Sequence, residues 1–137
     1  SVLVKNGYFD SGRACFDQLL KRGQPAYVPH FRVSAEELIS LIRGAGGIPV
    51  LANPKAVGDE TVIMTLAAQG LQGIEAFYPT YDRQDTQHYL DVAQQHGLLV
   101  SGGSDYRGFP GRGTEKIGQF TIEDVYAKNF YRPPQHT

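Results

Sequence analysis

One stretch decides the fold: Gly97-Leu98-Leu99-Val100-Ser101-Gly102-Gly103-Ser104-Asp105-Tyr106-Arg107-Gly108. Gly97 is typical of a helix end, and the apolar run at residues 98–100 predicts a buried strand. Two glycines then open a loop that carries Ser104 and Asp105. Because functional carboxylates in α/β proteins commonly follow the C-terminal end of a strand, this loop is the first candidate site.

The same order of helix, glycine and strand occurs three times. Gly47, Gly73 and Gly97 each precede a predicted strand, about 25 residues apart, which is the size of a βα unit. We therefore predict an α/β fold in which parallel strands alternate with helices. Three strands cannot close a barrel, which takes about eight, so we expect part of a β/α barrel with exposed sheet edges. Either the rest of a barrel or a second copy of the chain would cover those edges.

Helix starts are marked by capping residues. Ser34 and Glu37 form a capping box, and the helix that they open is expected to bury one apolar stripe. That stripe comprises Leu38, Ile39, Leu41, Ile42 and Ala45. Asp82 is expected to cap a later helix that ends at Gly97.

The N-terminal segment has a different pattern. The sequence of residues 1–22 predicts a helix, a turn and a second helix, and two prolines keep residues 25–31 extended. The regular order of helices and strands begins after this segment, at Ser34.

Composition excludes several classes of protein. The chain has 137 residues, of which 41% are hydrophobic, and its net charge is −1. This suits a globular domain with a core and gives no basic patch for bulk nucleic-acid binding. No apolar run approaches the ~18 residues of a membrane span. The single cysteine, Cys15, cannot form an internal disulfide, which favours a reducing compartment, and we expect a cytoplasmic protein.

Polar residues follow all three predicted strands. These are Asn53, Tyr78 and the pair Ser104 and Asp105. Since the carboxyl ends of parallel strands converge on one face, we expect these side chains to form one site. Asn53 and Tyr78 each precede a proline, so a simple turn is the alternative interpretation of both.

Glycines and arginines next to Asp105 suggest anion binding. Backbone amides in a glycine-rich loop can surround a phosphate, and Arg107 and Arg112 suit its geometry. An ordinary surface loop is the alternative. His30 lies on the extended segment and reaches the site if that segment crosses the face. No two histidines have the spacing of metal ligands.

Four stretches together resemble the C-terminal half of the PHP (polymerase and histidinol phosphatase) domain. They begin at Pro25, Gly46, Gly73 and Gly102, and they include Ala52-Asn53-Pro54 and Ser104-Asp105-Tyr106-Arg107-Gly108. The branch that they most resemble contains small bacterial metal-dependent phosphoesterases, which hydrolyse nucleotide phosphates or short oligonucleotides. The resemblance implies a distorted seven-stranded β/α barrel and a centre of divalent Mn, Mg, Fe or Zn. It also implies that residues 1–32 are the end of a helical insertion with an extended connector, and that residues 33–137 are the C-terminal half of the barrel.

This chain departs from the family at two expected metal ligands. Asn53 stands where the family has the histidine of Ala-His-Pro, and Arg107 stands where it has the histidine of Ser-Asp-Phe-His-Gly. Of the ligands expected from this half, Asp105 remains. An amide is a poor ligand beside imidazole, and a guanidinium cannot ligate a metal at all. We therefore expect a degenerate metal site in which Arg107 pairs with Asp105 or contacts phosphate directly.

Three functions remain open from the sequence. The first is a PHP-type phosphoesterase, weak or inactive as this fragment, with Asp105, Asn53 and Arg107 as candidate catalytic residues. The second is a module that binds a small phosphorylated ligand or nucleotide without catalysis. Its candidate contacts are Arg107, Arg112, Ser104, Tyr78 and His30. The third is a structural domain that assembles through an exposed sheet edge.

Overall fold

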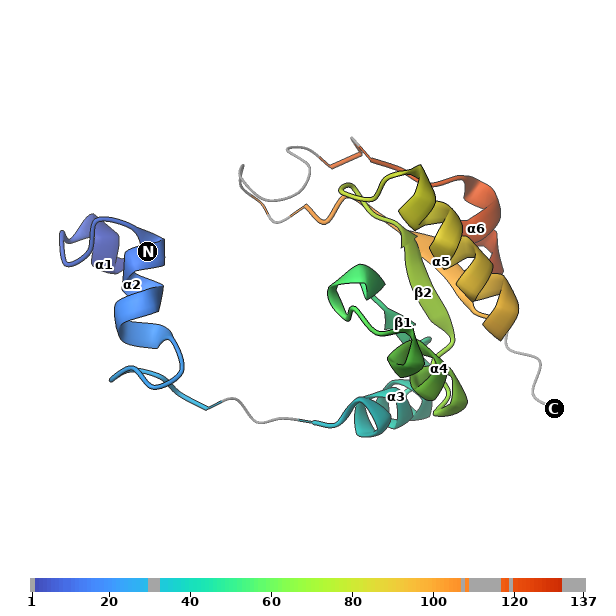
Figure 1. Cartoon of the computed structure of the whole chain (residues 1–137), viewed down its shortest axis with the longest axis horizontal. Coiled ribbons are helices and arrows are strands. Elements are labelled where there is room, and N and C mark those ends of the chain that lie inside the picture. The colour runs from blue at the N-terminus through green and yellow to red at the C-terminus, as the bar shows by residue number, and fades with distance from the viewer. Residues whose placement is uncertain (1, 30–32, 107, 109–116, 119, 132–137) are drawn as a thin grey trace. The chain divides into compact units, whose positions relative to one another are not determined.

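The chain forms two compact units, Ser1–Val33 and Ser34–Thr137 (Figure 1). The computed structural model describes residues 2–29, 33–106, 108, 117–118 and 120–131. Three of the predicted site residues, His30, Arg107 and Arg112, lie outside the described residues.

The first unit is a small helical structure. It contains α1 (Val2–Lys5), α2 (Gly12–Cys15) and a π-helical turn, η1 (Phe16–Leu20). The Ser11 hydroxyl caps α2 by accepting the Ala14 N–H at 3.1 Å. The predicted helix, turn and second helix are therefore confirmed.

A parallel sheet organises the second unit. Its strands are β1 (Val50–Leu51), β2 (Gly73–Phe77) and β3 (Leu99–Gly102), in the order β1-β2-β3. Both pairings are parallel, and the register between β2 and β3 shifts between Glu75 and Phe77. The predicted α/β class with parallel strands is confirmed. The first strand has two residues, in keeping with the preceding Pro49, which has no N–H to donate to a neighbouring strand.

Helices alternate with the strands. They are α3 (Ala35–Gly44), α4 (Glu60–Ala68), α5 (Arg83–His96) and α6 (Asp124–Lys128), with the short 3₁₀ turns η2 (Pro54–Ala56) and η3 (Asn129–Tyr131). Helix α5 packs along β2 and β3, and α6 packs against β3 (Figure 1). The two capping predictions are confirmed, because Ser34 and Glu37 form a capping box on α3 and Asp82 caps α5.

Two clusters of buried side chains form the core. The larger lies between the sheet and α5, around the completely buried Ile74. Its other buried members are Ile63, Ala76, Tyr89, Val92 and Ala93. The smaller cluster comprises Ile39, Leu66 and Leu71.

The stripe predicted for α3 is partly wrong. Ile39 is buried, but the side chains of Leu38 and Leu41 are 49% and 64% exposed. A helix periodicity identifies an apolar face without saying whether another element covers it. In the described structure, only the part of this face around Ile39 meets the core.

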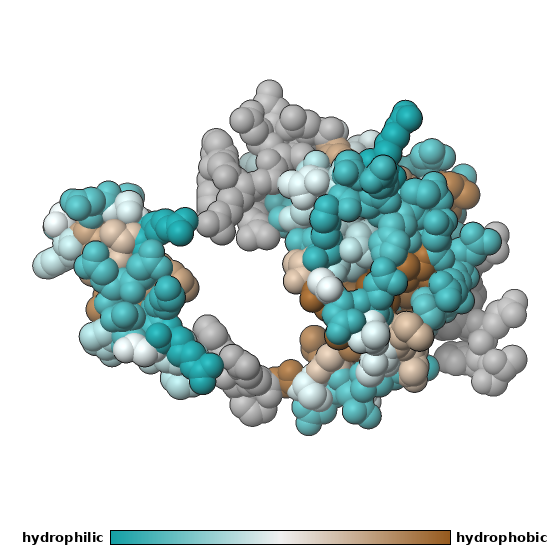
Figure 2. Space-filling model, in the orientation of Figure 1, coloured by the Kyte–Doolittle hydropathy of each residue, from teal (hydrophilic) through white to brown (hydrophobic). Residues whose placement is uncertain are grey.

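The visible surface is largely polar. Hydrophilic residues predominate on the face of the Ser34–Thr137 unit shown in Figure 2. Within the described ranges, none of the helices combines the length and the apolar character that a membrane span requires.

Candidate functional site at the carboxyl ends of the strands

The predicted strand-end residues lie at one edge of the sheet. The three parallel strands end at Leu51, Phe77 and Gly102. Asn53, Tyr78 and Asp105 follow them, each within three residues. Parallel pairing brings the carboxyl ends of the strands together, as the alternation of helices and strands in the sequence predicted.

Asn53 forms a tight turn directly after β1. Its backbone is left-handed, with φ 43° and ψ 59°, a conformation that asparagine tolerates better than most residues. Its N–H donates a 2.8 Å hydrogen bond to Glu75 Oε2 on β2. The following residue, Pro54, is fully buried and begins η2. Asn53 does form a turn before a proline, and it is also tied to the neighbouring strand.

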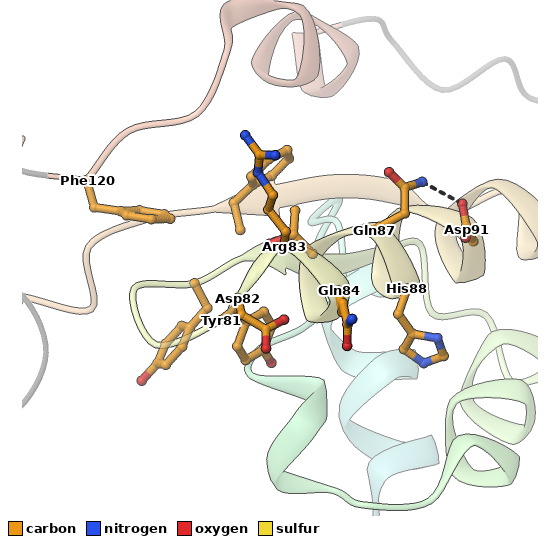
Figure 3. A pocket seen from close by; sticks show the side chains of 11 residues that line it. Tyr81, Asp82, Arg83, Gln84, Gln87, His88, Asp91 and Phe120 are labelled. Atoms are coloured by element: carbon orange, nitrogen blue, oxygen red, sulfur yellow. Dashed lines mark hydrogen bonds between the residues drawn. The ribbon is translucent and has the colours of Figure 1, made fainter.

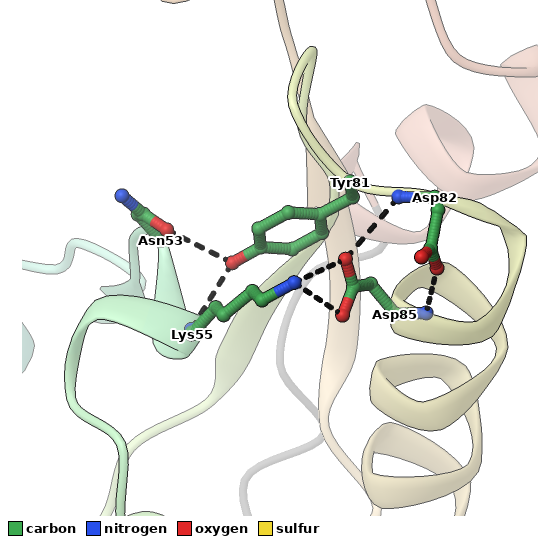
Figure 4. Close-up of polar contacts among 5 residues, drawn as sticks. All are labelled: Asn53, Lys55, Tyr81, Asp82 and Asp85. Carbon is green, nitrogen blue, oxygen red and sulfur yellow. Dashed lines mark hydrogen bonds and ion pairs between the residues drawn. The ribbon is translucent and has the colours of Figure 1, made fainter.

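Tyr81 connects this turn to the start of α5. Its hydroxyl donates to Asn53 Oδ1 at 3.0 Å and accepts the Lys55 N–H at 3.1 Å (Figure 4). Its ring contacts those of Tyr78 and Tyr89, with centroids 5.3 and 5.4 Å away. Burial raises the pKa of Tyr81 to about 12, so the hydroxyl keeps its proton at neutral pH.

An ion pair between Lys55 and Asp85 also connects the turn to α5. Lys55 Nζ lies 2.7 Å from Asp85 Oδ1 and 2.6 Å from Oδ2 (Figure 4). This hydrogen bond is the main cause that lowers the pKa of Asp85 and raises the pKa of Lys55. Asp85 also accepts the Asp82 N–H at 3.2 Å within the capping box of α5. The ion pair therefore links η2 to the first turn of α5.

Asp105 lies in the loop after β3. It too has a left-handed backbone, with φ 47°. Its Oδ2 accepts a 2.7 Å hydrogen bond from the Tyr78 hydroxyl. Burial is the main cause that raises the pKa of Glu75; the negative charge of Asp105 raises it further, and the Asn53 hydrogen bond opposes both. Two carboxylates therefore influence each other at this sheet edge.

The structure thus joins three of the four predicted site residues that it describes through the side chains of Tyr78 and Tyr81. Tyr78 reaches Asp105, its ring contacts Tyr81, and Tyr81 reaches Asn53. Ser104 is half-buried beside Asp105. Sequence reasoning missed Tyr81, together with Lys55 and Asp85. The signal available for Tyr81 was its place immediately before the capping residue Asp82, in the loop after a strand.

An open cavity of about 860 Å³ adjoins this cluster (Figure 3). It shares Tyr78 and Tyr81 with the strand-end site and extends along α5. Its lining residues are Phe77, Tyr78, Tyr81, Asp82, Arg83, Gln84, Thr86, Gln87, His88, Asp91 and Phe120. The cavity is large enough for a small organic ligand.

The described residues do not complete a metal centre. Within the described part of the chain, no group of three or more histidine, cysteine, aspartate or glutamate side chains could hold a metal. Asp105 and Glu75 supply carboxylates, but the amide oxygen of Asn53 already accepts the Tyr81 hydroxyl. A divalent metal here would need ligands from elsewhere in the protein.

Two curated proteins are similar to this chain, while no family model matches it. One is a 3′,5′-nucleoside bisphosphate phosphatase from Chromobacterium violaceum, 35% identical over 121 residues, which cover 85% of this chain and 42% of that protein. The other is a phosphoribosyl 1,2-cyclic phosphate 1,2-diphosphodiesterase from Eggerthella lenta, 34% identical over 58% of this chain and 30% of that protein. The chain therefore spans less than half the length of these relatives.

Two solved structures share the fold. A protein described as a metal-dependent phosphoesterase from Bifidobacterium adolescentis has a TM-score of 0.71 and 25% identity, covering 93% of this chain and 46% of that one. An amidohydrolase from Chromobacterium violaceum, with bound sulfate and no metal, has a TM-score of 0.60 and 31% identity, covering 97% of this chain and 50% of that one. The chain is similar to PHP-type phosphoesterases. These similarities support the resemblance to PHP-type phosphoesterases that the sequence indicated.

Proposed function

We propose that this chain is part of a PHP-type phosphoesterase that hydrolyses a phosphate ester of a nucleotide, with its site at the carboxyl ends of β1, β2 and β3. The observation that carries the proposal is the linked cluster of Asn53, Tyr78 and Asp105 at one sheet edge. The name of one relative, the 3′,5′-nucleoside bisphosphate phosphatase, supports a nucleoside bisphosphate as the substrate class.

Each residue of the cluster has a role in this proposal. Asp105, oriented by the Tyr78 hydroxyl, would contact the reacting phosphate or the attacking water. Ser104 and Tyr78 would contribute polar contacts to the phosphate. The predicted contacts of Arg107, Arg112 and His30 stay predictions, as does compensation of the Asp105 charge by Arg107.

The finer structural statements also belong to the proposal. A distorted seven-stranded barrel needs more strands than the three described, and the whole protein would supply them. The assignment of residues 1–32 to a helical insertion and of 33–137 to half of a barrel remains a prediction. So do the use of Mn, Mg, Fe or Zn, the degenerate state of the metal site and a cytoplasmic location.

A second candidate is binding of a phosphorylated ligand without turnover. Two observations favour it. The described residues provide no group of three metal ligands, and the similar amidohydrolase structure holds a sulfate in the absence of metal. Sulfate has the shape and charge type of phosphate, so that protein binds an anion of this kind without metal.

One experiment separates these candidates. The whole protein is incubated with a nucleoside 3′,5′-bisphosphate, with and without added Mn²⁺, and released inorganic phosphate is measured. Release well above the protein-free rate supports the phosphoesterase. Calorimetric binding of the bisphosphate without release supports the second candidate. A protein that neither binds nor hydrolyses it contradicts both.

A further inference from the structure

The orientation of the Asn53 side chain follows from the hydrogen bonds around Tyr81. The Lys55 backbone N–H can only donate, so the Tyr81 oxygen accepts it at 3.1 Å. The phenol has one proton, which is left for the contact of 3.0 Å with Asn53. In that contact the hydroxyl donates to the amide oxygen Oδ1, which faces Tyr81. The amide nitrogen Nδ2 then lies on the side away from Tyr81, as Figure 4 shows.

Several contacts hold this orientation in place. The Asn53 N–H is bound to Glu75 Oε2, which fixes the turn to β2. The Tyr81 ring packs between Tyr78 and Tyr89, and the ion pair of Lys55 with Asp85 holds the far side of the turn. Rotating the amide by half a turn would lose the hydrogen bond that Oδ1 accepts from the Tyr81 hydroxyl.

The amide nitrogen is the part of Asn53 that these contacts leave for a ligand. Within the described residues, Nδ2 donates no hydrogen bond, whereas Oδ1 and the backbone N–H are both engaged. An amide nitrogen has no basic lone pair for a metal, but it supplies two N–H donors. Two carboxylates, Glu75 and Asp105, already lie at this sheet edge, so an arriving phosphate needs donors that offset their charge.

We propose that Asn53 donates a hydrogen bond from Nδ2 to a phosphoryl oxygen of the substrate, and that Tyr81 is the positioning residue that aims it. This inference rests on the proposed function, since it requires a phosphorylated ligand at the strand ends. It gives the Asn53 position a role in binding the anion, in place of the metal-ligand role that a histidine would have there.

Two substitutions at Asn53 test the proposal in the whole protein, with a nucleoside 3′,5′-bisphosphate as the probe. Asn53→Asp keeps an oxygen for Tyr81 and turns the donor into a charged acceptor. Asn53→Gly keeps the left-handed turn and removes the side chain. We expect KM, or Kd if binding occurs without turnover, to rise at least about tenfold for Asn53→Asp and by less for Asn53→Gly.

Other orders of affinity overturn the proposal. A metal-ligand role predicts that Asn53→Asp binds Mn²⁺ more tightly and keeps or gains activity, because a carboxylate is the better ligand. A purely local role in the turn predicts that all three proteins have equal KM and Kd. If the unmodified protein neither binds nor hydrolyses the bisphosphate, the proposed function itself fails, which is a different result from either of these.

The role of Tyr81 is tested separately. Tyr81→Phe removes the hydroxyl that orients the amide, and we expect a higher KM with a smaller change in kcat. Tyr89→Phe is the matched control, because Tyr89 is a buried tyrosine of the same aromatic stack. Equal KM values for the two variants would contradict positioning by Tyr81.

Discussion

The Tyr78 hydroxyl donates a 2.7 Å hydrogen bond to Asp105 Oδ2, which joins the residue after β2 to the loop after β3. The acceptor is a carboxylate, and such bonds are stronger than those between neutral groups. Asp105 occupies a left-handed turn with φ 47° in a loop of small residues, so this bond helps to fix its direction.

Tyr78→Phe should lower kcat/KM by about tenfold, because Asp105 loses a donor that orients it. The fold should persist, since the ring still packs against Tyr81. Steady-state kinetics and a melting curve measure the two effects. Tyr126→Phe is the control, as Tyr126 is a half-buried tyrosine of α6 whose ring contacts Phe77. A normal kcat/KM for Tyr78→Phe would show that this bond does not serve activity.

Gly102→Ala should destabilise the protein by about 1–3 kcal/mol, because the site has no room for a methyl group. A Cβ at this position would lie 2.6 Å from Ile122 Cγ2 and 2.6 Å from the Phe77 oxygen. Gly103→Ala should be tolerated, since nothing lies within 4 Å of a Cβ there. Denaturant unfolding compares the two. Equal stability of the two variants would contradict this packing.

Lys55→Met should lower the melting temperature at neutral pH by removing the ion pair with Asp85. The pKa of Asp85 is lowered from 3.8, so its contribution is present above 3.8 and is lost as the pH falls through the lowered value. The pKa of Lys55 is raised from 10.5, so its contribution is present below 10.5 and is lost as the pH rises through the raised value.

The destabilisation by Lys55→Met should therefore shrink in acid and in strong alkali. Melting curves across this pH range, with Lys128→Met as the exposed control, measure it. A destabilisation that does not change with pH would argue that Lys55 acts only through the packing of its aliphatic stem.

Glu75→Gln should raise the melting temperature at neutral pH. The pKa of Glu75 is raised from 4.5, chiefly by burial and also by Asp105. The ionised side chain therefore lowers the free energy of unfolding, which is a cost to folding. That cost is present above the raised pKa and disappears as the pH falls below 4.5, where Glu75 is protonated in both states. The glutamine oxygen can still accept the Asn53 N–H. Melting curves at several pH values, with the exposed Glu36→Gln as a control, test this; a lower melting temperature at neutral pH would contradict it.

Local signals in the sequence predicted much of the fold. The caps at Ser34 and Asp82 and the helix end at Gly97 depend on neighbouring residues, and the structure has all three. The gathering of Asn53 and Asp105 at one edge follows from parallel topology, which the helix–strand alternation indicated.

The remaining contacts depend on residues far apart in the chain. Tyr81 meets Asn53 across 28 positions, and Glu75 meets Asn53 across 22. No local pattern marks such pairs, because they exist only once β1, β2 and α5 have packed. The exposure of Leu41 was missed for a related reason, since a periodic stripe does not reveal what covers it.

Asp105→Asn tests whether the strand ends around Asp105 form a phosphoester site, because it removes the carboxylate that would contact the phosphate or the attacking water. Asparagine keeps the size of the side chain and tolerates the left-handed turn. Asp124→Asn, at an exposed residue of α6 that does not line the cavity, is the control. Phosphate release from a nucleoside 3′,5′-bisphosphate by the whole protein should fall at least about 100-fold in Asp105→Asn and stay normal in Asp124→Asn. Loss of a positioned acid–base group typically costs about 100-fold or more in rate. Release by Asp105→Asn within about twofold of that by the unmodified protein would therefore contradict a phosphoester site at Asp105.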